Sequence, residues 1–317
     1  MKITDLLKSG KKPLFTFELL PPLKGNTIQT IYDAIDPLLE FDPSYINVTY
    51  HQSETVYTHR KDGLIEKKVI RKRPGTVAIS AAIKNKYKIT VVPHLICGGF
   101  TREETEDALI ELNFLGIHNI IALRGDAPGG SRVFIPEENG HRYTNELVEQ
   151  IMDLNNGKYL SEDLKHNYKT EFSVGVAGYP EKHIEAPNMD IDLINLKRKV
   201  DAGAEYVVTQ MFFDNKKFFE FVDKCRAIGI TVPIIPGLKP VSTLNDIELI
   251  PQTFAIDLPV DLTNEIQKCK TNKEVRQLGI EWCTMQSKEL NEHNVPGLHY
   301  YTLSQSDNIA KIAKKVF

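Results

Sequence analysis

Eight short apolar segments, spaced along the whole chain and separated by longer amphipathic stretches, constrain the fold more than any other feature of this sequence. The apolar runs predict buried strands, and the stretches between them predict helices. Strands joined by helices pair in parallel through right-handed crossovers, and eight of them can close into a barrel. We therefore expect an α/β fold with a single (β/α)8 TIM barrel, and a doubly wound open sheet is the alternative on pattern alone. The expected strands are 13–19, 45–49, 90–95, 119–124, 172–178, 206–212, 232–237 and 298–303.

The helical segments carry their own start and stop signals. Thr101 and Glu104 have the spacing of a capping box, and the helix that they open is expected to end near Gly116. A second amphipathic helix within 191–204 closes at Gly203, as helices that end in a left-handed residue commonly do. These signals support the alternation of strands and helices.

Three connections between the expected strands are long, and they hold the extra elements of the barrel. The first contains a charged insertion at about 57–74, and the last has room for two or three helices. No segment has the composition of a linker, so we expect one catalytic barrel domain over 1–317 with a helical tail at about 304–317. The long connections are 50–89, 125–171 and 238–297.

Composition and charge exclude several classes of function. Of 317 residues, 41% are hydrophobic and 26% are charged, and the net charge of -3 gives no electrostatic case for binding nucleic acid. No apolar run approaches the roughly 18 residues of a membrane span, and no secretion signal is evident. We expect a cytoplasmic protein with unpaired thiols at its four cysteines, Cys97, Cys225, Cys269 and Cys283.

Polar side chains recur at the carboxyl ends of the expected strands, where barrel enzymes carry their active sites. In the first strand, Phe15 and Phe17 share one face and Glu18 lies on the other, so Glu18 is expected to face the barrel interior. A solvent-exposed strand end is the plainer explanation for any single one of these residues. The other members of the set are Thr49, His94, Arg124, Asp126, Tyr179, Gln210 and Thr302.

Glu18 lies in an apolar run, which favours a raised pKa and a role as proton donor. An ion pair with a lysine or arginine at the barrel rim is equally compatible with the sequence. Arg124, Gly125 and Asp126 follow a buried-looking strand, and a glycine between two charges suits close approach of a ligand to the backbone, although a rim salt bridge would give the same pattern.

Three further patterns have both a functional and a plain explanation. Asp192, Asn195 and Lys199 share one stripe of a helix, which is either a binding face or a solvated face. The basic stretch 67–73 is either an anion or RNA site or, as we favour, a solvated hairpin. His183 has no convergent set of ligands in the sequence, so no metal is expected. Glycine-rich nucleotide motifs and a hydrolase nucleophile motif are absent.

In combination, eight motifs resemble the methylenetetrahydrofolate reductase family, in order and over about 15–303. They are FTFELLPP, INVTY, VVPHLIC, IIALRGD, VAGYPEKHIEA, LINLKRKVDAGAEYVVTQMFFD, IIPGLKPVS and LHYYTL. The resemblance implies a barrel with non-covalent FAD that reduces 5,10-methylenetetrahydrofolate to 5-methyltetrahydrofolate with NADH or NADPH, in a ping-pong reaction that feeds methionine synthesis. It also implies a bacterial-type catalytic barrel without the regulatory domain by which larger members sense S-adenosylmethionine. A homo-oligomer is possible.

The resemblance also assigns roles to individual positions. Glu18 corresponds to the general acid that opens the five-membered ring to an iminium cation, and Asp126 to the carboxylate that stabilises this cation near the flavin. Substrate contacts are expected at Glu18, Gln210, Leu244 and Tyr301. Flavin contacts are expected at Thr49, His94, Arg124, Gly125, Asp126, Tyr179, His183, Asp192, Asn195, Arg198 and Lys199.

Three positions depart from the family pattern. His51 stands where a small residue is usual, Leu244 where a phenylalanine is usual, and Gln305 where an arginine can occur. These departures affect the expected nicotinamide and folate contacts rather than the reaction. Two competing functions remain open at this point. One is a flavin-free pterin-binding barrel that transfers a one-carbon group, and the other is a non-enzymatic folate- or anion-binding protein.

Overall fold

The computed structural model describes residues 1–10, 13–127, 133–302 and 306–317, so Gln305, one of the three departures from the family pattern, lies outside the described residues. Eight parallel strands form a closed barrel in the order β1-β10-β9-β8-β7-β6-β5-β2. This confirms the barrel prediction and excludes the open sheet. The strands are β1 (Leu14–Leu19), β2 (Tyr45–Val48), β5 (Thr90–Ile96), β6 (Asn119–Leu123), β7 (Ser173–Gly178), β8 (Tyr206–Met211), β9 (Ile234–Leu238) and β10 (Gly297–Tyr301).

The alternation of side chains in β1 is as the sequence predicts. Phe15 and Phe17 are almost fully buried in the apolar layer between the strands and the helices. Thr16 points the other way and its hydroxyl lies 2.9 Å from Nδ1 of His299 inside the barrel. Glu18 therefore faces the interior near the carboxyl end of its strand, where it lines a cavity.

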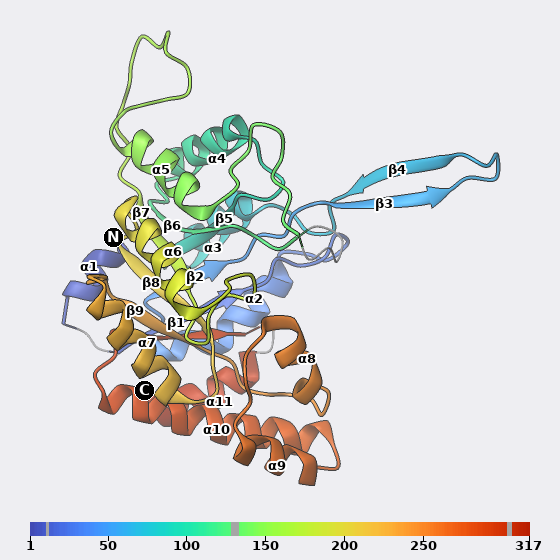
Figure 1. Cartoon of the computed structure of the whole chain (residues 1–317), viewed down its shortest axis with the longest axis vertical. Helices are drawn as coiled ribbons and strands as arrows, with labels where there is room; N and C mark the ends of the chain where they lie inside the picture. Colours follow the sequence, from blue (N-terminus) through green and yellow to red (C-terminus); the bar gives the residue numbers. More distant parts are fainter. Residues whose placement is uncertain (11–12, 128–132, 303–305) are drawn as a thin grey trace.

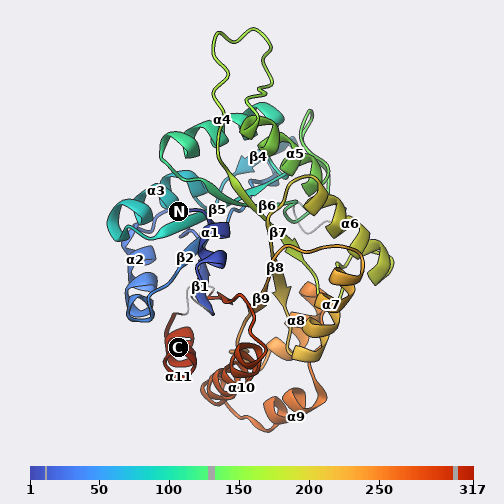
Figure 2. The same cartoon turned by 90° about the vertical axis from the view of Figure 1, so that its left-hand side faces the viewer.

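The helices surround the strands, as Figure 2 shows. The capping box of α4 is confirmed, because the Glu104 backbone N–H donates to the Thr101 hydroxyl and the Thr101 N–H donates to the Glu104 carboxylate. The connection at 238–297 holds three helices, α8 to α10. The helices are α2 (Gln29–Ile35), α3 (Thr76–Tyr87), α4 (Arg102–Phe114), α5 (Thr144–Asn155), α6 (Met189–Asp201), α7 (Asn215–Ala227), α8 (Asp246–Phe254), α9 (Val260–Lys268), α10 (Asn272–Glu292) and α11 (Ser306–Val316), with a 3-10 turn at Asp36–Phe41.

A short N-terminal helix, α1 (Ile3–Lys8), closes the amino end of the barrel. Ile3 is fully buried among interior side chains that include Tyr45 and Tyr206, and its backbone N–H donates to Asn119 Oδ1 at 2.8 Å. Apolar side chains therefore fill this end of the interior. The open end is the one at which the strands finish.

The charged insertion is a two-stranded antiparallel hairpin, β3 (Glu54–His59) and β4 (Ile65–Ile70), which projects from the barrel (Figure 1). Lys67 and Lys68 lie on its exposed second strand, and Lys68 pairs with Glu66 at 3.2 Å. The solvated hairpin that we favoured from the sequence is confirmed. None of the helices in the described ranges is both long and apolar enough to cross a membrane.

Candidate active site

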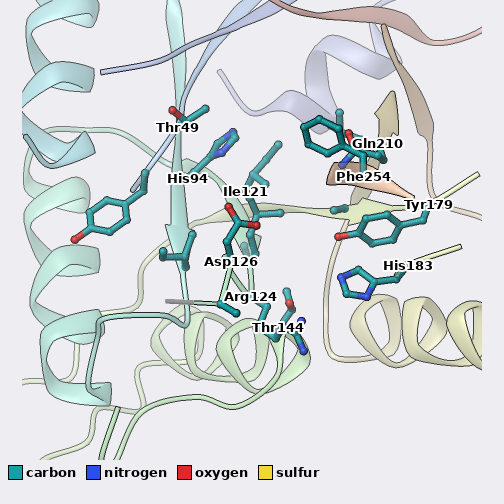
Figure 3. A pocket seen from close by; sticks show the side chains of 18 of the residues that line it. Thr49, His94, Ile121, Arg124, Asp126, Thr144, Tyr179, His183, Gln210 and Phe254 are labelled. Atoms are coloured by element: carbon teal, nitrogen blue, oxygen red, sulfur yellow. The ribbon is translucent and has the colours of Figure 1, made fainter. Parts of the chain in front are cut away.

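A cavity of about 1720 Å³ opens at the carboxyl ends of the strands. Figure 3 shows Asp126 projecting between His94 and Arg124, with Tyr179 beside His183 and Gln210 beside Phe254. The structure therefore brings residues from distant motifs into one space. The lining includes these predicted site residues: Glu18, Thr49, His94, Arg124, Gly125, Asp126, Tyr179, His183, Asp192, Asn195, Arg198, Lys199, Gln210 and Tyr301.

Leu244 is a predicted substrate contact that is not part of this lining. It lies in the loop after β9, is 40% exposed, and its backbone N–H donates to Asn272 Oδ1 at 3.0 Å. His51, the other departure from the family pattern, does line the cavity. The role of Leu244 in substrate binding stays a prediction.

Glu18 is the buried acid of the cavity. Its side chain is 12% exposed, and burial raises its pKa from 4.5 to about 8. The nearest basic group is His94, whose Nε2 lies 3.8 Å from the carboxylate, and burial lowers the pKa of His94 to about 3. No lysine or arginine in the described ranges pairs with Glu18, so the rim ion pair is excluded there. The predicted raised pKa is confirmed, and Glu18 is protonated at neutral pH.

Asn47 and His299, which the sequence patterns did not single out, lie beside Glu18 and His94 inside the barrel and belong to the same uncharged region. The Asn47 amide lies within hydrogen-bond distance of His94 Nε2, at 3.3 Å, and His299 packs edge-to-face against Tyr301 at 5.2 Å between ring centroids. Burial lowers the pKa of His299 to about 3. Asn47 precedes Thr49 by two residues, and His299 precedes Tyr301 by two, so the period of two in a strand could have found both.

The segment after β6 is held by specific contacts on both sides. Arg124 forms a bidentate ion pair with Glu185 rather than with Asp126. Gly125 has a φ of +85°, and a Cβ there would lie 2.9 Å from Ile96 Cδ1, so the position requires glycine. Gln52 Nε2 donates to the backbone oxygen of Asp126 at 2.7 Å. These contacts fix the backbone from which Asp126 projects into the cavity.

The polar stripe of α6 contributes to the cavity wall. Asp192 is buried and accepts the backbone N–H of His183 at 2.9 Å, which ties the loop after β7 to the helix. Lys199 donates to the backbone oxygen of Ala177 at 2.5 Å, and burial lowers its pKa to about 8. Arg198 donates to Asn195 at 3.2 Å near the exposed end of the stripe. The stripe is therefore more than a solvated face.

The cavity wall carries cations that could bind the phosphates of a cofactor, and a buried hydroxyl that could form a hydrogen bond with it. Arg124 and Lys199 lie on the β6–β7 side, and cations of this kind bind phosphate. The Thr49 hydroxyl is buried and has no hydrogen-bond partner within the described chain. No cluster of three or more candidate metal ligands occurs in the described ranges. The donor set fits an anionic organic cofactor better than a metal ion.

Comparisons with known proteins identify the family of the chain. A sequence model of the family described as methylenetetrahydrofolate reductase matches residues 2–316. "Methylenetetrahydrofolate reductase (NADH) 1" of Arabidopsis thaliana is 31% identical over 96% of this chain and 49% of its own length. "5,10-methylenetetrahydrofolate reductase" of Escherichia coli is 31% identical over 92% of this chain and 86% of its own. The chain thus spans about half the length of plant relatives and most of the bacterial one.

A solved structure supports the fold. An uncharacterized protein from Clostridium thermocellum, described as binding two copies of 5-methyl-5,6,7,8-tetrahydrofolic acid, aligns with a TM-score of 0.58. The alignment covers 99% of this chain and 97% of that one, at 13% identity, and so it bears on fold alone. The match of the family model along the chain, together with the similarity to the curated relatives, shows that the chain belongs to the methylenetetrahydrofolate reductase family.

Proposed function

We propose that this protein reduces 5,10-methylenetetrahydrofolate to 5-methyltetrahydrofolate with NADH or NADPH, by a ping-pong reaction through non-covalent FAD that feeds methionine synthesis. We further propose that 1–317 form one catalytic barrel domain. The observation that carries the proposal is the neutral, buried Glu18 in a cavity shared with Asp126 and several cations. That combination suits proton delivery to a folate and stabilisation of the cation that results.

The residues present fit FAD. Arg124 and Lys199 offer positive charge for its phosphates, and the buried Thr49 hydroxyl lacks a partner in the described chain. The remaining contacts would come from His94, Tyr179, His183, Asp192, Asn195 and Arg198, which line the same cavity. FAD, when bound, supplies the hydride chemistry of the reaction.

The chain's own contribution is the management of one proton and one positive charge. Glu18, protonated at neutral pH, donates to the nitrogen of the folate's five-membered ring, and the ring opens to an iminium cation. Asp126 stabilises that cation from the β6 side of the cavity. Gln210 and Tyr301 would hold the folate beside Glu18, since β10 pairs Tyr301 with Glu18 in register.

The proposed electron donor is a nicotinamide dinucleotide, either NADH or NADPH. The names of relatives specify NADH for the Arabidopsis protein and NADPH for a probable reductase of Caenorhabditis elegans. Both are about equally similar to this chain, at 31% and 28% identity. The proposal therefore covers NADH and NADPH.

An absorption spectrum tests the proposal. The purified protein should be yellow, carry about one FAD per chain, lose its flavin absorbance with NADH or NADPH under anaerobic conditions, and recover it with 5,10-methylenetetrahydrofolate. Folded protein that neither retains nor rebinds FAD would refute the proposal. Such a protein would favour a flavin-free barrel that transfers a one-carbon group.

A further inference from the structure

Lys239 is a cation of the cavity wall with no role in the steps described above. It follows directly after β9, and β9 pairs with β10 so that Leu238 lies opposite Tyr300. The next position along β10, Tyr301, is opposite Glu18. Leu238 is fully buried in the outer apolar layer, so strand alternation turns Lys239 inward, and it lines the cavity. Lys239 therefore lies at the level of the proposed proton donor.

The ammonium group of Lys239 has no carboxylate in direct contact with it in the described part of the chain, although Asp246 attracts it from a greater distance. Within the described residues its side chain forms no ion pair or hydrogen bond, and burial and the charge of Asp246 are what act on it. The carboxylate that attracts it, Asp246, already accepts the backbone N–H groups of Ser242 and Thr243 at 2.7 and 3.2 Å. Burial lowers the pKa of Lys239. A partly desolvated cation without a partner gains from any anion that a ligand brings to it.

Gln210, on the adjacent strand β8, adds a second donor. Its side-chain oxygen accepts the backbone N–H of Met211 at 3.0 Å, which leaves its NH₂ group for the cavity. Phe254 lies beside it, as Figure 3 shows, and supplies an apolar surface. This part of the wall therefore offers two donors next to an aromatic ring. Those features suit a ligand that carries an anion on an apolar or aromatic body.

We propose that Lys239 and Gln210 form an anion subsite that binds a carboxylate or phosphate group of a substrate. Lys239 follows β9 and Gln210 lies on β8, whereas Arg124 follows β6, so β7 lies between this part of the wall and Arg124. The inference rests on the proposed function, which supplies two sources for such an anion. They are the glutamate carboxylates of the folate and the phosphates of the nicotinamide dinucleotide.

Equilibrium binding to the FAD-loaded protein tests the subsite. The variants are Lys239→Met, which keeps an unbranched stem, Lys239→Arg, which keeps the charge, and Gln210→Leu. Lys216→Met is the matched control, because Lys216 is 80% exposed on α7. The ligands are 5-methyltetrahydrofolate, a 5-methyltetrahydropterin without the glutamate, NADH and NADPH. Thermal melting checks that each variant is folded.

Lys239→Met should weaken binding of the anionic substrate about 10- to 100-fold, the usual range for losing a charged hydrogen bond. Lys239→Arg should stay within a few-fold of the parent, and Gln210→Leu should weaken the same ligand. If Lys239→Met loses affinity for the folate and not for the dinucleotides, the bound anion is a glutamate carboxylate. In that case the glutamate-free pterin should bind Lys239→Met as tightly as it binds the parent. Loss confined to one or both dinucleotides identifies a phosphate.

Two results would overturn the subsite while leaving the proposed function intact. One is that folded Lys239→Met binds every ligand within about twofold of the parent. The other is that it loses the glutamate-free pterin as strongly as the folate, which would indicate a packing role. A parent protein that binds neither folate nor dinucleotide would instead overturn the proposed function, and the subsite with it.

Discussion

Replacing Glu18 by glutamine should separate the two halves of the proposed reaction. The amide has nearly the same shape but cannot donate the proton that opens the folate ring. General acid catalysis contributes about 10²- to 10⁴-fold, so reoxidation of the reduced enzyme by 5,10-methylenetetrahydrofolate should slow by that factor. Reduction by NADH should change little. In the parent, the folate step should slow as pH rises through about 8, because Glu18 then loses its proton.

The same substitution should stabilise the protein without substrate. Burial raises the pKa of Glu18 from 4.5 to about 8, so ionisation disfavours the folded state. The penalty is absent below pH 4.5 and grows by about 1.4 kcal/mol per pH unit until the folded pKa is reached. At pH 7 it amounts to about 3 kcal/mol as an upper figure. Glu18→Gln removes this penalty, so its advantage over the parent should shrink as pH falls toward 4.5.

Stopped-flow measurement of each half-reaction and denaturant unfolding at pH 5 and pH 7 would check both expectations. Glu220→Gln is the control, because Glu220 is 53% exposed and its pairing with Lys216 at 3.9 Å contributes little. Equal slowing of both half-reactions would mean that Glu18 maintains the fold of the site rather than donating a proton. If Glu18→Gln were less stable than the parent at pH 7, this would refute the argument that ionisation of the buried Glu18 disfavours the folded state.

Three other substitutions test neighbouring parts of the site. Asp126→Asn should raise the flavin midpoint potential, because a negative charge that disfavours the anionic reduced flavin is lost, and slow the folate half-reaction; an unchanged or lower potential in a redox titration would count against this placement of Asp126. Gly125→Ala should destabilise the protein by about 1–3 kcal/mol in denaturant unfolding, since the new Cβ meets Ile96 at a positive φ. Lys199→Met should weaken FAD about tenfold or more in a fluorescence titration, and in the parent FAD affinity should fall as pH rises past about 8, where Lys199 loses its charge; pH-independent affinity would contradict this.

The barrel could be predicted because its signals are local. Each strand is a short apolar run, and most runs carry a polar residue at or near their carboxyl end, such as Glu18, Thr49 or His94. Parallel strands then bring these ends together without any further information. Successive parallel strands joined by right-handed connections lie next to one another, and this gives the order of the strands and the closure of β1 on β10. This is why so many predicted site residues line one cavity.

Other details of the site depend on strand registers and loop paths that the local sequence pattern does not determine. Lys239 is a plain lysine in a loop until the pairing of β9 with β10 sets it level with Tyr301. Leu244 follows the same strand, yet the loop carries it away from the cavity lining. A register irregularity between Val208 and Met211 also affects where Gln210 lies. Such details come from packing over the whole barrel rather than from the local pattern.

The burial that keeps Glu18 protonated also prepares it for the state after proton transfer. Around it, His94 and His299 are neutral because the same loss of solvent disfavours their charged forms. In the proposed mechanism, proton transfer from Glu18 to the folate would produce a carboxylate and an iminium cation together in this weakly polar region. Their attraction there is stronger than it would be in water. In the proposed mechanism Glu18 would thus complement Asp126 as a counter-charge after proton transfer, a role that the amide of Glu18→Gln could not take.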